Sequence, residues 1–170
     1  MIGLKLKKVK FGPENKEIID QVQSWIDNDN TNYVKRRLFN GEQGSFRLLV
    51  EDSLGSRVKR QSAYAYLHNG EVIGIVLTTE IELTENGHST MNITTICANP
   101  SDPSPIIETE MISDLKACQA KVQMPDIFSD FSYVNKDLAT VFAANGFHII
   151  EEDNNIHAYY QLEKTYEKTL

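Results

Sequence analysis

The chain has 170 residues, of which 41% are hydrophobic and 24% charged, and its formal net charge is −7. That composition predicts one globular domain over residues 1–170 and excludes a disordered or fibrous chain. Residues 61–170 carry 5 basic and 16 acidic side chains, which argues against nucleic-acid binding and favours a cationic partner. No stretch reaches the ~20 apolar residues of a membrane span, so we expect a cytoplasmic protein without a membrane partner. The two cysteines are expected to be buried, and no metal site is predicted.

The first 60 residues predict one strand and two or three helices. Residues 4–11 alternate apolar side chains with lysine, as an edge strand does. Pro13 is expected to open a helix with an apolar stripe from Ile18 to Ile26. Residues 33–39 and 46–54 predict one or two further helices, interrupted by Asn40-Gly41 and Gly44.

Two Asn-Gly pairs, at 69–70 and 86–87, separate three strand-like runs at 62–68, 71–83 and 89–98. Asn-Gly between alternating runs indicates a two-residue hairpin turn, so these runs predict an antiparallel meander. With two-residue turns, Tyr66 would pair with Ile73 and Ile75 with Ala98. A one-residue slip would exchange the two faces of the sheet.

The second half predicts two helices and three strands. After a Pro-rich loop, Ser104 is a candidate N-cap, and Pro105 would take the first position of a helix reaching residue 122. A strand at 126–134 and a helix at 135–144 follow. Asn145-Gly146 would end that helix, and a hairpin of residues 147–151 and 156–162 would close the fold.

The segment Tyr133–Phe147, read as YVNKDLATVFAANGF, and this order of elements resemble the GNAT acetyltransferase superfamily. Asn135, Gly146 and Phe147 fall at the family's spacing. The resemblance implies an α/β fold with a mixed, mostly antiparallel twisted sheet of six or seven strands and helices on both faces. It also implies acetyl-CoA as co-substrate and direct acyl transfer to a small-molecule or peptide amine. The expected partners include a second copy of the chain, in a possible homodimer.

The resemblance also implies a location for the donor. If the sheet splays beside residues 95–98, the gap would hold the acyl-pantetheine arm, with backbone groups of Ile96, Cys97 and Ala98 on the thioester. The binding residues expected around this arm are Ser101, Ser104, Ile106 and Asn135.

The catalytic candidates are carboxylates and one tyrosine. Glu80 and Glu82 are two residues apart in one strand, so they share a face and are candidate bases for the amine. Tyr133 is a candidate acid for the leaving thiolate. The basic runs at 35–37 and 57–60 are expected either to be solvated or to attract the 3′-phosphate of coenzyme A.

Two departures from the family keep an alternative open. Residues 99–106 contain no glycine and no basic side chain, and their three prolines remove backbone donors for a diphosphate. Asp102, Glu108 and Glu110 add negative charge there, and Phe142 replaces the family's proton-donating tyrosine. The alternative is a GNAT-fold binding or regulatory module without turnover. An α/β topology unrelated to acyl transfer is a third reading.

Overall fold

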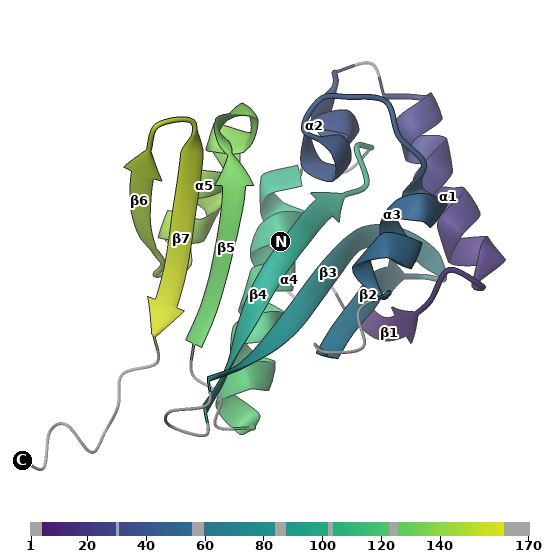
Figure 1. Cartoon of the computed structure of the whole chain (residues 1–170). Coiled ribbons are helices and arrows are strands. Elements are labelled where there is room, and N and C mark those ends of the chain that lie inside the picture. Colours follow the sequence, from purple (N-terminus) through teal and green to yellow (C-terminus); the bar gives the residue numbers. More distant parts are fainter. Residues whose placement is uncertain are drawn as a thin grey trace, which may run out of the picture.

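Seven strands form one sheet in the order β1-β2-β3-β4-β5-β7-β6, with helices on both faces (Figure 1). The structure, a computed structural model, describes residues 5–29, 31–55, 60–83, 88–101, 104–122 and 126–161. The strands are β1 (Lys7–Phe11), β2 (Arg60–His68), β3 (Glu71–Leu83), β4 (His88–Ala98), β5 (Asp126–Ser132), β6 (His148–Glu152) and β7 (Asn155–Gln161). The helices are α1 (Lys16–Asp27), α2 (Tyr33–Phe39), α3 (Phe46–Ser53), α4 (Ser104–Lys121) and α5 (Lys136–Ala144), and a 3-10 turn, η1 (Tyr133–Asn135), precedes α5. The predicted α/β fold with a mostly antiparallel sheet is confirmed.

The β2-β3-β4 meander follows from its turn chemistry. Asn69 and Gly70 have φ values of 52° and 80°, and a type I′ turn needs positive φ at both residues. The predicted pairing of β2 with β3 and of β3 with β4 is confirmed, and β1 lies at the sheet edge. The second Asn-Gly pair, 86–87, lies outside the described residues.

The predicted register of the meander is wrong by one residue. Tyr66 lies opposite Gly74 instead of Ile73, because Ile73 is an extra residue of β3 where the pairing shifts between Tyr66 and Leu67. Ile75 lies opposite Cys97 instead of Ala98 for a separate reason: Leu83 lies opposite His88 at the end of that hairpin, and β4 has an extra residue opposite the Leu77–Thr78 step. A bulge of this kind reverses which side chains share a face, and the turn sequence does not reveal it.

Gly74 shows which face of β3 meets α4. A Cβ on Gly74 would lie 2.6 Å from Sδ of Met111 and 3.3 Å from a methyl of Ile107, both on α4. A Cβ at this position would require the flexible end of the Met111 side chain to move. Residues 74, 76, 78 and 80 of β3 therefore point towards the α4 side.

The helices divide into two layers (Figure 1). Helices α1, α2 and α3 contact β3, β4 and β2 on one face, whereas α4 and α5 lie behind the sheet. The apolar stripe of α1 from Ile18 to Ile26 is buried as predicted. The helix begins later than predicted, because the Asn15 side chain, and not Pro13, caps it through the Ile18 N–H. No helix in the described ranges is long and apolar enough to cross a membrane.

The one parallel step of the sheet is short. β4 and β5 pair only over residues 90–92 and 126–128. Beyond these positions β4 continues for six residues and β5 for four without pairing to each other. This divergence positions the candidate site.

Candidate functional site

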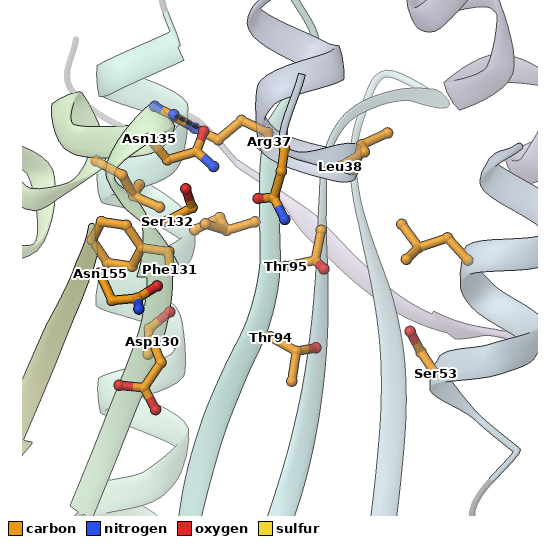
Figure 2. A pocket seen from close by; sticks show the side chains of 15 residues that line it. Arg37, Leu38, Ser53, Thr94, Thr95, Asp130, Phe131, Ser132, Asn135 and Asn155 are labelled. Carbon is orange, nitrogen blue, oxygen red and sulfur yellow. Dashed lines mark hydrogen bonds between the residues drawn. The ribbon is translucent and has the colours of Figure 1, made fainter. Parts of the chain in front are cut away.

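A cleft of about 490 Å³ lies where β4 and β5 part (Figure 2). Residues 94–96 form its β4 wall, residues 129–132 form its β5 wall, and α2 and α3 contribute further lining. Thr94 is the extra residue of a second bulge, and its hydroxyl donates to the Leu77 carbonyl at 3.1 Å. Because bulges bend their strand, Thr94 explains why β4 leaves β5 here. The gap that the resemblance implied is therefore present.

Fewer backbone N–H groups of β4 point into this cleft than predicted. The Ala98 N–H donates to the Tyr33 hydroxyl of α2 at 2.9 Å. Successive N–H groups of a strand point to opposite sides, so the Cys97 N–H points towards Ile75 of β3. The Ile96 N–H points to the same side of the strand as the Ala98 N–H, and Ile96 lines the cleft. Ile96 is thus the member of the predicted trio that faces the cleft.

Arg37 of α2 reaches across the end of the cleft towards Asn135 (Figure 2). Its guanidinium donates to both carboxylate oxygens of Glu108 on α4, at 2.9 and 3.3 Å, and to Asn135 Oδ1 at 2.8 Å. It also donates twice to Asp137 of α5, at 2.9 and 3.1 Å. The side chains of Arg37 and Glu108 are only 2% and 1% exposed. One α2 side chain therefore joins α4, η1 and α5.

This cluster has no spare positive charge. Burial raises the pKa of Glu108, and the charge of Arg37 opposes that shift without reversing it. Burial lowers the pKa of Arg37, but its hydrogen bonds to Asp137 and the charge of Glu108 outweigh burial and raise it. Burial raises the pKa of Asp137, but hydrogen bonds from Arg37 outweigh it and set the value at about 2. Because Arg36 also pairs with Asp137, two cations face two anions.

Asn135 was predicted to bind the acyl donor, but its side-chain amide is hydrogen-bonded to residues of α2. Its Oδ1 accepts from Arg37, and its Nδ2 donates to the Arg36 carbonyl at 2.8 Å. The expectation of a solvated or phosphate-binding run at 35–37 is wrong for Arg37, which is buried in this cluster. Residues 57–59 of the other basic run lie outside the described residues.

The loop between β4 and α4 is organised by Asn99. Its Oδ1 accepts from both the N–H and the hydroxyl of Ser101, at 3.0 and 2.7 Å, and its Nδ2 donates to the Val72 carbonyl. The two hydrogen-bond donors of Ser101, a predicted cofactor-binding residue, are therefore used within the loop. Ile106 is exposed in the first turn of α4. Residue Asp102 and the side chain of Ser104 lie outside the described part.

Of the predicted catalytic residues, neither Glu80 nor Tyr133 lines the cleft. Glu80 shares the α4-side face with Gly74, and its carboxylate lies 4.0 Å from Arg60. Glu82 lies opposite Ser89 in the ladder, and its side chain is outside the described part. Tyr133 is 45% exposed, with Lys136 over its ring.

Phe142 fills its position as a core residue. It is fully buried, and its ring lies 5.8 Å from Phe131 and 4.8 Å from Phe147. A phenylalanine that packs in the core therefore stands where the resemblance implied a tyrosine, and its ring has no proton to give to a thiolate.

An Asp–His pair at the mouth of the cleft was not predicted. Asp130 of β5 and His157 of β7 are direct cross-strand neighbours, and the Asp130 carboxylate is hydrogen-bonded to His157 Nδ1. Asp130 lines the cleft beside Asn155 (Figure 2). An imidazole held by a carboxylate at Nδ1 keeps Nε2 available for a proton. The pair is 27 residues apart in sequence, and only the β5–β7 register brings it together.

Comparisons with known structures identify the fold as that of the GNAT acetyltransferases. The GNAT domain of S. lividans PAT aligns at a TM-score of 0.66 and 11% identity, covering 92% of this chain and 90% of that one. A GNAT-family acetyltransferase from Listeria monocytogenes aligns at 0.65 and 14%, covering 95% and 97%. The PaiA N-acetyltransferase of Thermoplasma acidophilum, in complex with coenzyme A, aligns at 0.61 and 12%, covering 93% and 99%. No protein-family model and no curated protein matches the sequence.

Proposed function

We propose that this protein is an acyltransferase that moves an acyl group from a pantetheine thioester, such as acetyl-CoA, to an amine. The observation that carries the proposal is the parting of β4 and β5 at the Thr94 bulge. It opens a cleft with Ile96 on one wall and Asp130 on the other. The similarity to solved N-acetyltransferases, one of them bound to coenzyme A, supports this choice of donor.

In the proposed reaction the amine attacks the thioester directly. The Ile96 N–H would stabilise the negative charge that develops on the acyl oxygen. His157, oriented by Asp130, would take the proton that an ammonium must lose before it attacks. The N–C bond then forms, the C–S bond breaks, and the second amine proton goes to the departing sulfur. A covalent acyl-cysteine at Cys97 is unfavourable, because burial raises the pKa of this thiol.

The two ends of a coenzyme A donor meet different surroundings. The thioester end fits the cleft, where Ile96 and Asp130 line opposite walls and Asp130 is hydrogen-bonded to His157. The diphosphate end does not fit the described residues, because Asn99 holds both donors of Ser101 and Glu108 neutralises Arg37. We therefore expect weak binding of coenzyme A, dominated by its pantetheine arm.

A second candidate is a binding module without turnover. Two hydrogen bonds from α2 favour it, because they use groups that were predicted to bind the acyl donor. The Tyr33 hydroxyl accepts from the Ala98 N–H, and Arg37 donates to the side-chain oxygen of Asn135. Phe142 favours it as well, since it removes the family's acid.

Calorimetric titration with acetyl-CoA, with desulfo-coenzyme A and ATP as controls, separates the two candidates. An acyltransferase binds acetyl-CoA and desulfo-coenzyme A more tightly than ATP, because the pantetheine arm supplies the contacts. Thr94→Trp, which fills the cleft, should abolish this binding, whereas Thr140→Trp on the exposed side of α5 should not. No binding of acetyl-CoA at millimolar concentration would reject the acyltransferase.

A further inference from the structure

Two nucleophilic side chains are in contact between β1 and the C-terminal end of α4. The Lys8 amine of β1 donates to Sγ of Cys118 on α4 at 3.0 Å, and the two residues are 110 positions apart in the sequence. This distance is shorter than the sum of the van der Waals radii of nitrogen and sulfur. Neither residue lines the cleft, so the contact has no part in the function proposed above.

The surrounding side chains hold the Lys8 amine against the sulfur. Lys8 and Tyr66 are direct neighbours across β1 and β2, so their side chains lie on the same face of the sheet. Asp114, one turn before Cys118 on α4, accepts from the buried Tyr66 hydroxyl at 2.7 Å and pairs with the Lys8 amine at 3.0 Å. The Tyr64 ring centre lies 5.1 Å from the same amine. The amine is therefore positioned by a carboxylate and an aromatic ring as well as by the sulfur.

The two cysteines of the chain differ in their access to solvent. Cys97 is fully buried, and burial raises the pKa of its thiol, which makes it unreactive. Cys118 is half-buried, so a molecule as small as a peroxide can reach its sulfur. Peroxide converts a thiolate into a sulfenic acid, and a sulfenic acid condenses with a neighbouring thiol or nitrogen. Cys118 has such a nitrogen in contact with its sulfur.

We propose that a peroxide joins Cys118 and Lys8 through a reversible sulfur–nitrogen bond, a sulfenamide, and this modification does not depend on the acyltransferase function. The Cys118 thiolate attacks one peroxide oxygen, the O–O bond breaks, and the departing hydroxide takes a proton from the Lys8 ammonium and leaves as water. The neutral Lys8 amine then attacks the sulfur of the sulfenic acid. The S–N bond forms, the S–O bond breaks, and the hydroxyl leaves as water with a second proton of the amine. The sulfur is oxidised by two electrons, and one peroxide is reduced to two waters.

The environment of Lys8 provides the proton that the first step needs. Burial lowers the pKa of Lys8, but its hydrogen bonds to Cys118 and Asp114 outweigh burial and raise the pKa. Lys8 is therefore an ammonium before the reaction, and it becomes a nucleophile only when the departing hydroxide removes its proton. This order places the neutral amine beside the sulfenic acid at the moment when the acid forms.

The bond would fasten the edge of the sheet to α4. Strand β1 lies at the sheet edge and pairs only with β2 (Figure 1). A covalent link between residues 110 positions apart restricts the unfolded chain, as a disulfide does. The oxidised protein should therefore unfold at a higher temperature, and a thiol that reduces the S–N bond should reverse the change.

Mass spectrometry of the full chain after treatment with a slight excess of hydrogen peroxide tests this proposal. We expect a mass lower by two hydrogens, a proteolytic fragment in which Lys8 is joined to Cys118, and the original mass after dithiothreitol. The Tm should rise by at least about 5 °C in the cross-linked protein. Lys8→Arg keeps a cation beside Asp114 but removes the nucleophilic amine, so it should form no cross-link and leave a sulfenic acid that dimedone traps. Lys10→Arg, at an exposed lysine of the same strand, is the matched control and should cross-link normally.

The proposal fails if Cys118 keeps its free thiol, if it is oxidised to a sulfinic acid with Lys8 unmodified, or if it forms a disulfide between two copies of the chain. It fails equally if Lys8→Arg and the unaltered protein give the same product. Cys118→Ser identifies the sulfur that reacts: the loss of two hydrogens should disappear in this variant, and its persistence would assign the oxidation to Cys97.

Discussion

Replacing Arg37 with methionine should remove much of the stability of this fold. Methionine keeps an unbranched apolar stem but removes five hydrogen bonds to Glu108, Asn135 and Asp137. It also leaves the Glu108 carboxylate, 1% exposed, without its cation. Removing one partner of a buried ion pair costs about 3–5 kcal/mol, and we expect a loss of this size. Typical domains unfold at about 5–15 kcal/mol, so the variant would be close to the limit of stable folding.

Urea unfolding followed by the fluorescence of Trp25, the single tryptophan, measures this loss. With a slope of about 1–3 kcal/mol/M, the midpoint should fall by at least about 1 M. Arg36→Met is the matched control, because the Arg36–Asp137 pair is solvent-exposed and such pairs contribute about 0–1 kcal/mol. Adding Glu108→Leu to Arg37→Met should restore most of the loss. A loss below about 1 kcal/mol for Arg37→Met would refute the role assigned to this cluster.

Three further predictions concern single residues. The pKa of Asp137 is lowered to about 2, so its contribution is complete above its ordinary value near 4 and is lost as the pH falls towards 2; Asp137→Asn should flatten this part of the acid unfolding curve. Tyr33→Phe leaves the Ala98 N–H buried without an acceptor and should reduce the free energy of unfolding in urea by about 1–3 kcal/mol. Gly74→Ala should cost about 1–3 kcal/mol in the same assay, because its Cβ would lie 2.6 Å from Met111 Sδ, and a measurement near zero would show that the end of the Met111 side chain can move away.

The elements of the fold could be predicted from local patterns. Strand β3 has the predicted bounds, and the two helices of the second half were placed to within a residue or two. Asn69-Gly70 fixed the first hairpin because its positive φ values are a local property of those two residues. The bulges at Ile73 and Thr94 could not be predicted in this way. They depend on how β3 packs against α4 and on how β4 leaves β5, which are tertiary contacts.

The site was less predictable than the fold. Asn135 and Ile96 were named from the family pattern and do line the cleft. The burial of Arg37 was not predicted, because a run of three basic residues on a short helix is normally solvated. Its partner Glu108 lies 71 residues away. Asp130 and His157 likewise have no common motif and meet only through strand pairing.

The position of α2 has a consequence for the two substrates. Helix α2 closes the donor side through Tyr33 and Arg37, while Asp130 of β5 and Asn155 of β7 line the other wall of the cleft. If the phosphates of coenzyme A must separate Arg37 from Glu108, binding has to supply the free energy of that opening. An opening cost of about 3 kcal/mol weakens the apparent affinity by roughly 100-fold.

The variant Glu108→Gln would lower that opening cost, because it removes the buried counter-charge of Arg37 and leaves the guanidinium in place for a phosphate. We therefore expect it to bind acetyl-CoA at least about tenfold more tightly than the unaltered protein in calorimetric titration. Unchanged or weaker acetyl-CoA binding would mean that α2 does not restrict the donor. Arg37 and Glu108 would then matter only for stability, and the poor fit of the diphosphate would come from the loop held by Asn99.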